Sequence, residues 1–204
     1  MSTFVNKMNV SEVPLGINRL VLLDGVCVRQ KCTFLSGNQY MVVDPNGEPL
    51  FRAKESGGAT LLMGKDRSFD ITMTDMQDNK VITLRRPYTF GPDKMEVTVG
   101  KQLASVVRQQ MTFLKPVLNI NDPRDQLVLR VKGRAVTSGE CDFEILCPNK
   151  QRVGVIRKLW GGTTRELLTN KDSFKIQFPA DLDVRYKAAL IGTCLLIDFL
   201  YYNA

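Results

Sequence analysis

The segment DVRYKAALIGTCLLIDFLYYN, residues 183–203, decides the fold of this 204-residue chain. It abandons the alternation of the preceding sequence and becomes apolar on every side from Ala188 to Leu196. A helix without a polar face has to lie either in a protein core or in lipid. Asp183, directly before the apolar run, is a suitable N-cap because its carboxylate can accept hydrogen bonds from the first free backbone N–H groups.

We predict that this helix is buried in protein. A membrane-spanning helix needs about 20 apolar residues, whereas the uninterrupted run here is only about half as long and ends at Asp198. A carboxylate at that point would cost several kcal/mol in hydrocarbon. The residues of this buried helix or membrane segment are Ala188, Leu190, Ile191, Gly192, Leu195, Leu196, Ile197 and Phe199.

The alternative, a membrane span, has support of its own. Arg185 and Lys187 flank the run as cytoplasmic anchors would. Ala188 and Gly192 form a small-xxx-small pair, which suits contacts between membrane helices. The same small residues would also let a helix thread a narrow barrel, so the pair does not distinguish the two interpretations.

Upstream, from Tyr40 to Phe178, alternating apolar residues are followed by a polar turn and then by alternation again. In FDITMT, residues 69–74, the apolar residues fall on one face of an extended strand. Pro, Gly and Asp place turns at 44–47, 100, 122–123 and 148–150. Such a series of antiparallel hairpins can close as a barrel or stack as a sandwich. The all-apolar final helix favours the barrel, so the predicted fold class is mainly β.

Composition limits the function. The formal net charge of +7 indicates an anionic partner, either a phosphate backbone or acidic lipid headgroups. Histidine is absent, which excludes Ser-His-Asp triads and imidazole-ligated metals, so we do not expect an enzyme. The five cysteines include no Cys-x-x-Cys, and residues 1–13 lack a secretory signal. We expect an intracellular chain with a short flexible tail, 1–13, and one domain, 14–204.

One C-terminal stretch and three upstream segments, all collinear, carry a family resemblance. The stretch from DFEIL (142–146) through GVIRKLWGG (154–162) to DSFKIQFPADLDVRYKAALIGTCLLIDFLYY (172–202) closely resembles the phospholipid scramblase family. Upstream, PLGINRLVLLDGVCVRQ (14–30), YMVVDPNGEPLFRAKE (40–55) and DNKVITLRRP (78–87) match it more weakly. The resemblance implies a fold similar to the Tubby C-terminal domain, with a twelve-stranded barrel around a central apolar helix.

The resemblance also implies calcium as a cofactor. The family's calcium segment matches NKDSFKIQFPAD, in which the apolar members could offer only backbone carbonyls. Calcium takes six to eight oxygen ligands, and only two carboxylates remain here, so we expect weak affinity. The alternative is a core-facing strand that ends in the cap of the final helix. The candidate metal ligands are Asn170, Asp172, Phe174, Ile176, Phe178 and Asp181.

Basic residues are candidates for contact with anionic lipid. Each Lys or Arg close to an anionic leaflet contributes about 1 kcal/mol, and the alternative is an ordinary solvated strand face. Arg85 and Arg86 form a further local cluster. Nucleic acid is not expected as a partner, because no helix-turn-helix or RNP-like pattern is present. The candidates are Arg130, Lys132, Arg134, Arg157 and Lys158.

As the resemblance implies it, the function is ATP-independent phospholipid scrambling, calcium-stimulated if the segment from Asn170 binds the ion. The expected location is the cytoplasmic side of a membrane, the plasma membrane, with protein partners or further copies of the chain taking part. Cys141 alone survives at the positions of the family's acylated clusters, so dual acylation is not expected. The alternative function is a Tubby-like module that binds anionic lipid or a protein without scrambling.

Overall fold

The computed structural model describes residues 15–31, 39–56, 68–112, 115–134, 142–160 and 172–202. The predicted N-terminal tail, residues 1–13, lies outside these ranges. The described strands are β1 (Gly25–Lys31), β2 (Gln39–Val43), β3 (Pro49–Ser56), β4 (Phe69–Thr74), β5 (Lys80–Arg86), β6 (Lys94–Val99), β7 (Gln102–Gln109), β8 (Val117–Asn121), β9 (Leu127–Gly133), β10 (Asp142–Leu146), β11 (Arg152–Trp160) and β12 (Asp172–Gln177). The helices are a short 3₁₀ turn (Leu15–Ile17), α1 (Asn18–Val21) and α2 (Val184–Tyr201).

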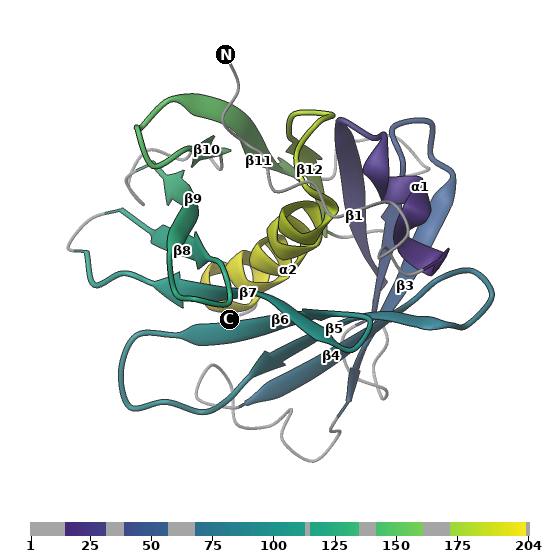
Figure 1. Cartoon of the computed structure of the whole chain (residues 1–204), viewed down its shortest axis with the longest axis horizontal. Helices are drawn as coiled ribbons and strands as arrows, with labels where there is room; N and C mark the ends of the chain where they lie inside the picture. The colour runs from purple at the N-terminus through teal and green to yellow at the C-terminus, as the bar shows by residue number, and fades with distance from the viewer. Residues whose placement is uncertain are drawn as a thin grey trace.

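The twelve described strands form one closed antiparallel barrel (Figure 1). Each strand pairs with the next along the chain, and β1 closes the ring by pairing with β12, with Val26 opposite Ile176. The alternation predicted for β4 is present, because its three apolar residues are buried while those between them are exposed or half-buried. Closure leaves no free sheet edge among these strands, which protects them from pairing with other chains. The predicted mainly β barrel is confirmed.

One type of turn recurs at the end of the barrel where α2 begins. Asp44, Asp75 and Asp122 each follow a strand, and their Oδ1 atoms accept hydrogen bonds from the backbone N–H groups two and four residues later, at 2.8–2.9 Å. The residue three positions after each aspartate has a φ of +90°, +65° or +64°. Asp, Asn and Gly suit such turns because the side chain bonds the local backbone and tolerates this conformation. The turns predicted at 44–47 and 122–123 are confirmed.

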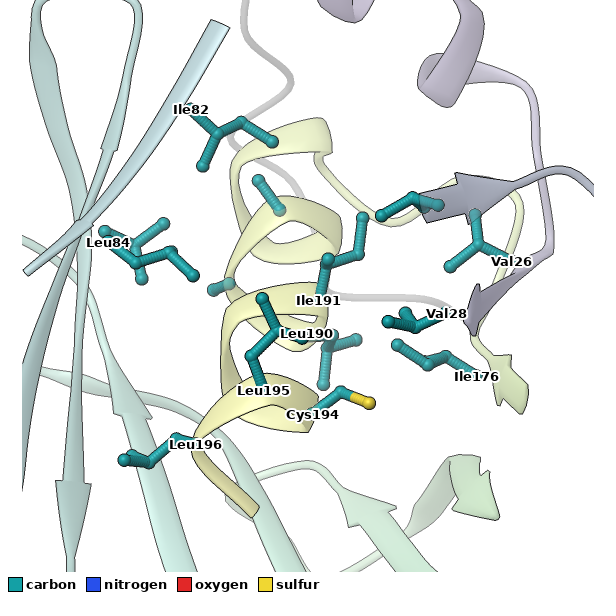
Figure 2. Packing of buried hydrophobic residues seen from close by; sticks show 14 of the residues in the cluster. Val26, Val28, Ile82, Leu84, Ile176, Leu190, Ile191, Cys194, Leu195 and Leu196 are labelled. Atoms are coloured by element: carbon teal, nitrogen blue, oxygen red, sulfur yellow. The ribbon is translucent and has the colours of Figure 1, made fainter. Parts of the chain in front are cut away.

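Helix α2 runs through the middle of the barrel (Figure 1). The Asp183 carboxylate caps its N-terminus by accepting a hydrogen bond from the Arg185 backbone N–H at 2.9 Å, as predicted. All eight residues predicted for the buried helix are buried, and the seven other than Gly192 are at most 6% exposed. Figure 2 shows side chains of α2, among them Leu190 and Ile191, between those of the surrounding strands, with Leu84 on one side and Val28 on the other.

The small residue in the middle of α2 suits its close approach to side chains of β5 and β6. A Cβ atom at Gly192 would lie 2.8 Å from Leu84 Cδ2 and 3.1 Å from Met95 Cε. Of the helices in the described ranges, none is both long and apolar enough to cross a bilayer. The barrel shields α2 on all sides, which confirms the protein-buried interpretation of residues 188–199.

Candidate functional site

Charged side chains lie inside the barrel beside the C-terminal end of α2. The Asp198 carboxylate is fully buried, accepts a hydrogen bond from Tyr40 Oη at 3.1 Å, and lies 3.8 Å from Lys158 Nζ. The Lys158 ammonium also lies over the ring of Tyr202, 3.8 Å from its centroid, and near the ring of Phe174. Buried charges require such partners, because an isolated ion in the interior is strongly destabilising.

A second buried ion pair lies at the same end of the barrel. Arg86 on β5 donates to Asp93 and lies over the ring of Phe199, 4.8 Å from its centroid. Nearby, Gln109 donates to Tyr201 Oη at 3.2 Å. Burial is the largest cause raising the pKa of Tyr201 above its usual value. These contacts join the last turn of α2 to β5 and β7.

The N-terminal end of α2 is held by Lys187. Its buried ammonium donates to the backbone carbonyls of Leu20, Val21, Leu23 and Ala180, at 2.6–3.3 Å. Burial lowers the pKa of Lys187 to about 8, and the nearby carboxylates, Asp181 first among them, act in the opposite direction. Lys187 therefore joins α2 to the end of α1, so both ends of the central helix are fixed by polar contacts.

Lys158 does not belong to the outer surface, so its assignment to a lipid-binding face is wrong. Its side chain is only 2% exposed and points into the barrel. Successive side chains of a strand point to opposite faces, so Arg157 and Lys158 could not both face outward. The same alternation separates Arg85, which is exposed, from Arg86, which is buried.

The other four predicted basic residues have side chains on the outside. Arg130 donates to Asn119 Oδ1 at 3.0 Å, and Arg157 makes a two-pronged contact with the Asp142 carboxylate. Lys132 and Arg134 are exposed at the end of β9, with Glu144 directly opposite Lys132 on β10. The structure brings these residues onto neighbouring strands but places acidic residues between them, so they do not form one uniformly basic patch.

The six predicted calcium ligands do not surround a common point. Asn170 lies outside the described residues, Asp172 is the first residue of β12, and Asp181 lies four residues beyond its last residue, Gln177. The strand alone spans roughly 17 Å at about 3.3 Å per residue. Phe174, Ile176 and Phe178 are buried. The structure thus favours the core-facing strand.

The backbone of this segment is also committed to the sheet. β12 pairs with β1 on one side and β11 on the other, so its carbonyls take part in the ladders. Among the described residues, no group of three or more Cys, Asp or Glu is arranged to hold a metal ion. The residues described do not fit a calcium site, and calcium binding stays a prediction.

Sequence reasoning missed the interior polar groups because it assigned basic residues to the surface by default. One signal was available for Lys158: the carboxylate of Asp198 interrupts an otherwise apolar helix, and a buried carboxylate calls for a cation. Which basic residue would supply that cation depends on the register between α2 and β11, and the helix sequence does not contain this information.

Comparisons with known proteins agree with this architecture. A family model described as Scramblase matches residues 1–204. Human phospholipid scramblase 1 is 30% identical over 94% of this chain and 67% of its own length, and human phospholipid scramblase family member 5 is 30% identical over 94% and 79%. Bovine phospholipid scramblase 2 is also 30% identical, over 93% and 72%.

A solved structure supports the fold. The X-ray structure of a protein from Arabidopsis thaliana superposes with a TM-score of 0.55 and 15% identity, covering 90% of this chain and 98% of that one. At this identity the likeness concerns the fold alone, which is Tubby-like as predicted. Taken with the family match over the whole chain, these findings show that the chain belongs to the scramblase family.

Proposed function

We propose that this protein acts at a phospholipid membrane and promotes ATP-independent movement of phospholipids between the two leaflets. The observation that carries the proposal is the match to the Scramblase family over residues 1–204, together with relatives named phospholipid scramblases at 30% identity. The net charge of +7 supports an anionic membrane as the partner. We place this membrane, again as a proposal, at the cytoplasmic face of the plasma membrane.

The buried state of α2 limits the mechanism. In this conformation the apolar residues of α2 are covered by the barrel. Lipid therefore meets only the outside or the ends of the barrel. Moving a polar headgroup across about 30 Å of hydrocarbon requires a polar path. We propose that the protein supplies this path by local thinning of the bilayer, together with further copies of the chain or a protein partner.

The test is reconstitution of the purified protein into vesicles containing a trace of NBD-labelled phospholipid. Dithionite reduces the label in the outer leaflet only, so scrambling makes the inner-leaflet label accessible as well. We expect loss of fluorescence well beyond the outer-leaflet share, without ATP. No additional loss under any condition would contradict scrambling. Release of fatty acid or headgroup would contradict the prediction that the protein is not an enzyme.

A second candidate is a Tubby-like module that binds anionic lipid or a protein without moving lipid. The sealed position of α2 favours it, because a domain with a fully covered core can dock on a membrane without opening. The same vesicles separate the two: sedimentation with the vesicles but no gain in dithionite access would support the binding module. Parallel reactions with calcium and with a chelator test the calcium stimulation predicted from the sequence.

A further inference from the structure

The described residues at the two ends of the barrel differ in charge. One end carries the described turns that precede β1, β3, β5, β7, β9, β11 and α2, at residues 22–24, 44–48, 75–79, 100–101, 122–126, 147–151 and 178–183. These turns contain nine acidic residues and three basic residues. We call this the acidic end. An anionic surface repels the acidic end, even though ion pairs such as Arg52–Asp78 neutralise some of its carboxylates.

The opposite end exposes apolar side chains. The segment between β5 and β6 presents Phe90, 99% exposed, and Tyr88, 50% exposed, whose rings meet edge to face at 5.2 Å. The segment between β7 and β8 presents Met111, 84% exposed. The two segments adjoin, because the Gln109 backbone N–H donates to the Asp93 carbonyl at 2.8 Å. We call Tyr88, Phe90 and Met111 the apolar tip.

Basic residues flank the apolar tip. Lys115 is exposed four residues after Met111, and the Gly133 backbone N–H donates to the Pro116 carbonyl at 2.8 Å. This bond places the end of β9, with exposed Lys132 and Arg134, next to the same segment. In the described parts of the two segments the one acidic residue is Asp93, and it is buried against Arg86. Where the structure describes this end, at residues 87–93, 110–112 and 115–116 and at the end of β9, its outer surface is therefore apolar with basic neighbours.

We propose that the apolar tip is the membrane-docking surface of the protein: Tyr88, Phe90 and Met111 enter the interfacial layer of an anionic bilayer while the acidic end points away from it. This rests on the proposed function, which it deepens by naming the surface that meets lipid. The charge difference between the two ends orients the barrel as it approaches. Tyr88 suits the headgroup level because its ring is amphipathic, and Phe90 and Met111 add apolar area that leaves water.

A bilayer fits this surface better than a folded partner does. Phe90 and Met111 project from separate segments and are 99% and 84% exposed, whereas protein interfaces place their anchor residues in packed pockets. A fluid bilayer can close around a projecting ring without shape complementarity. The combination of exposed apolar residues and basic neighbours also matches the two attractions that hold peripheral proteins on anionic membranes.

Binding to vesicles of phosphatidylcholine and phosphatidylserine tests this assignment. Phe90→Ser combined with Met111→Ser should weaken binding by at least about tenfold, since two apolar side chains no longer leave water. The matched control is Leu22→Ser, which removes an apolar side chain that is 86% exposed at the acidic end, and it should bind like the wild type. Equal binding by all three proteins, or equal loss in the control, would overturn the docking surface. If the variant with Phe90→Ser and Met111→Ser binds vesicles like the wild type but has lost the binding of a protein, the apolar tip contacts a protein partner and not a membrane.

A fluorescence measurement reports on the tip directly. Trp160 is the single tryptophan of the chain, so Trp160→Phe provides a silent background. In this Trp160→Phe background, the fluorescence of the Phe90→Trp variant should shift to shorter wavelength when vesicles are added, whereas that of the Leu22→Trp variant should not. If both variants bind vesicles but only Leu22→Trp shows the emission shift, the proposed orientation is refuted and the proposed function is left intact. Failure of the wild-type protein to bind any vesicle would refute both.

Discussion

The buried pair of Lys158 and Asp198 gives the sharpest test of how α2 is held in the barrel. The two charges lie 3.8 Å apart, with side chains 2% and 0% exposed. At an effective dielectric constant of about 20, their attraction at this distance is about 4 kcal/mol. Lys158→Met leaves the carboxylate without this cation, and Asp198→Asn leaves the ammonium without this anion. Each single variant should lose about 3–5 kcal/mol of the free energy of unfolding.

A double-mutant cycle measured by urea unfolding separates the pair from its surroundings. The combined variant should be more stable than the sum of the single effects predicts, by about 2–4 kcal/mol. The control cycle uses Arg52 and Asp78, which lie 2.9 Å apart but are 48% and 75% exposed. There the coupling should stay below about 1 kcal/mol. A coupling at the buried pair no larger than at the exposed pair would refute the argument that this pair anchors α2.

Three further predictions concern single positions. The pKa of Lys187 is lowered from 10.5 to about 8, so the folded protein binds this proton less tightly than the unfolded chain does. Between about pH 8 and pH 10.5 the free energy of unfolding should therefore rise relative to Lys187→Met, by up to about 3 kcal/mol; a difference that falls with pH contradicts the sign. Gly192→Val should lose at least about 2 kcal/mol, because its Cβ would already press on Leu84, whereas Gly91→Val, where a Cβ meets nothing within 4 Å, should change little in the same urea unfolding measurement. Calorimetric titration with calcium should give no Kd tighter than ~10⁻⁴ M, and Asp181→Asn should leave the heats unchanged; tight binding abolished by that substitution would contradict the geometry.

Much of the fold could be predicted from the sequence because its signals are local. Period-two alternation identifies strands such as Phe69–Thr74. Asp and Gly mark turns such as the one at 44–47, because the turn needs a side-chain acceptor and a positive φ within a few residues. The N-cap at Asp183 is equally local. The family resemblance supplied the strand number, which the periodicity alone did not.

The candidate site could be predicted less well, because its residues meet through long-range register. Whether Arg157 or Lys158 points inward depends on the pairing of β11 with β12, and a shift of one residue reverses every side chain of a strand. The predicted calcium ligands are dispersed for a related reason: their segment contains the strand β12, which carries the backbones of Asp172 and Asp181 toward opposite ends of the barrel. Proximity in sequence was no guide to proximity in space.

By itself the sequence determined that residues 188–197 form a helix with no polar face, and that a series of hairpins precedes it. Both follow from the order of apolar and polar residues over a few turns, which is a local property. The tertiary structure alone decided that the barrel covers this helix, that Lys158 meets Asp198, and that Phe90 and Met111 are exposed together. These outcomes depend on which distant strands become neighbours when the barrel closes, and closure satisfies the backbone hydrogen bonds and buries the inward-facing apolar side chains of the described strands at once.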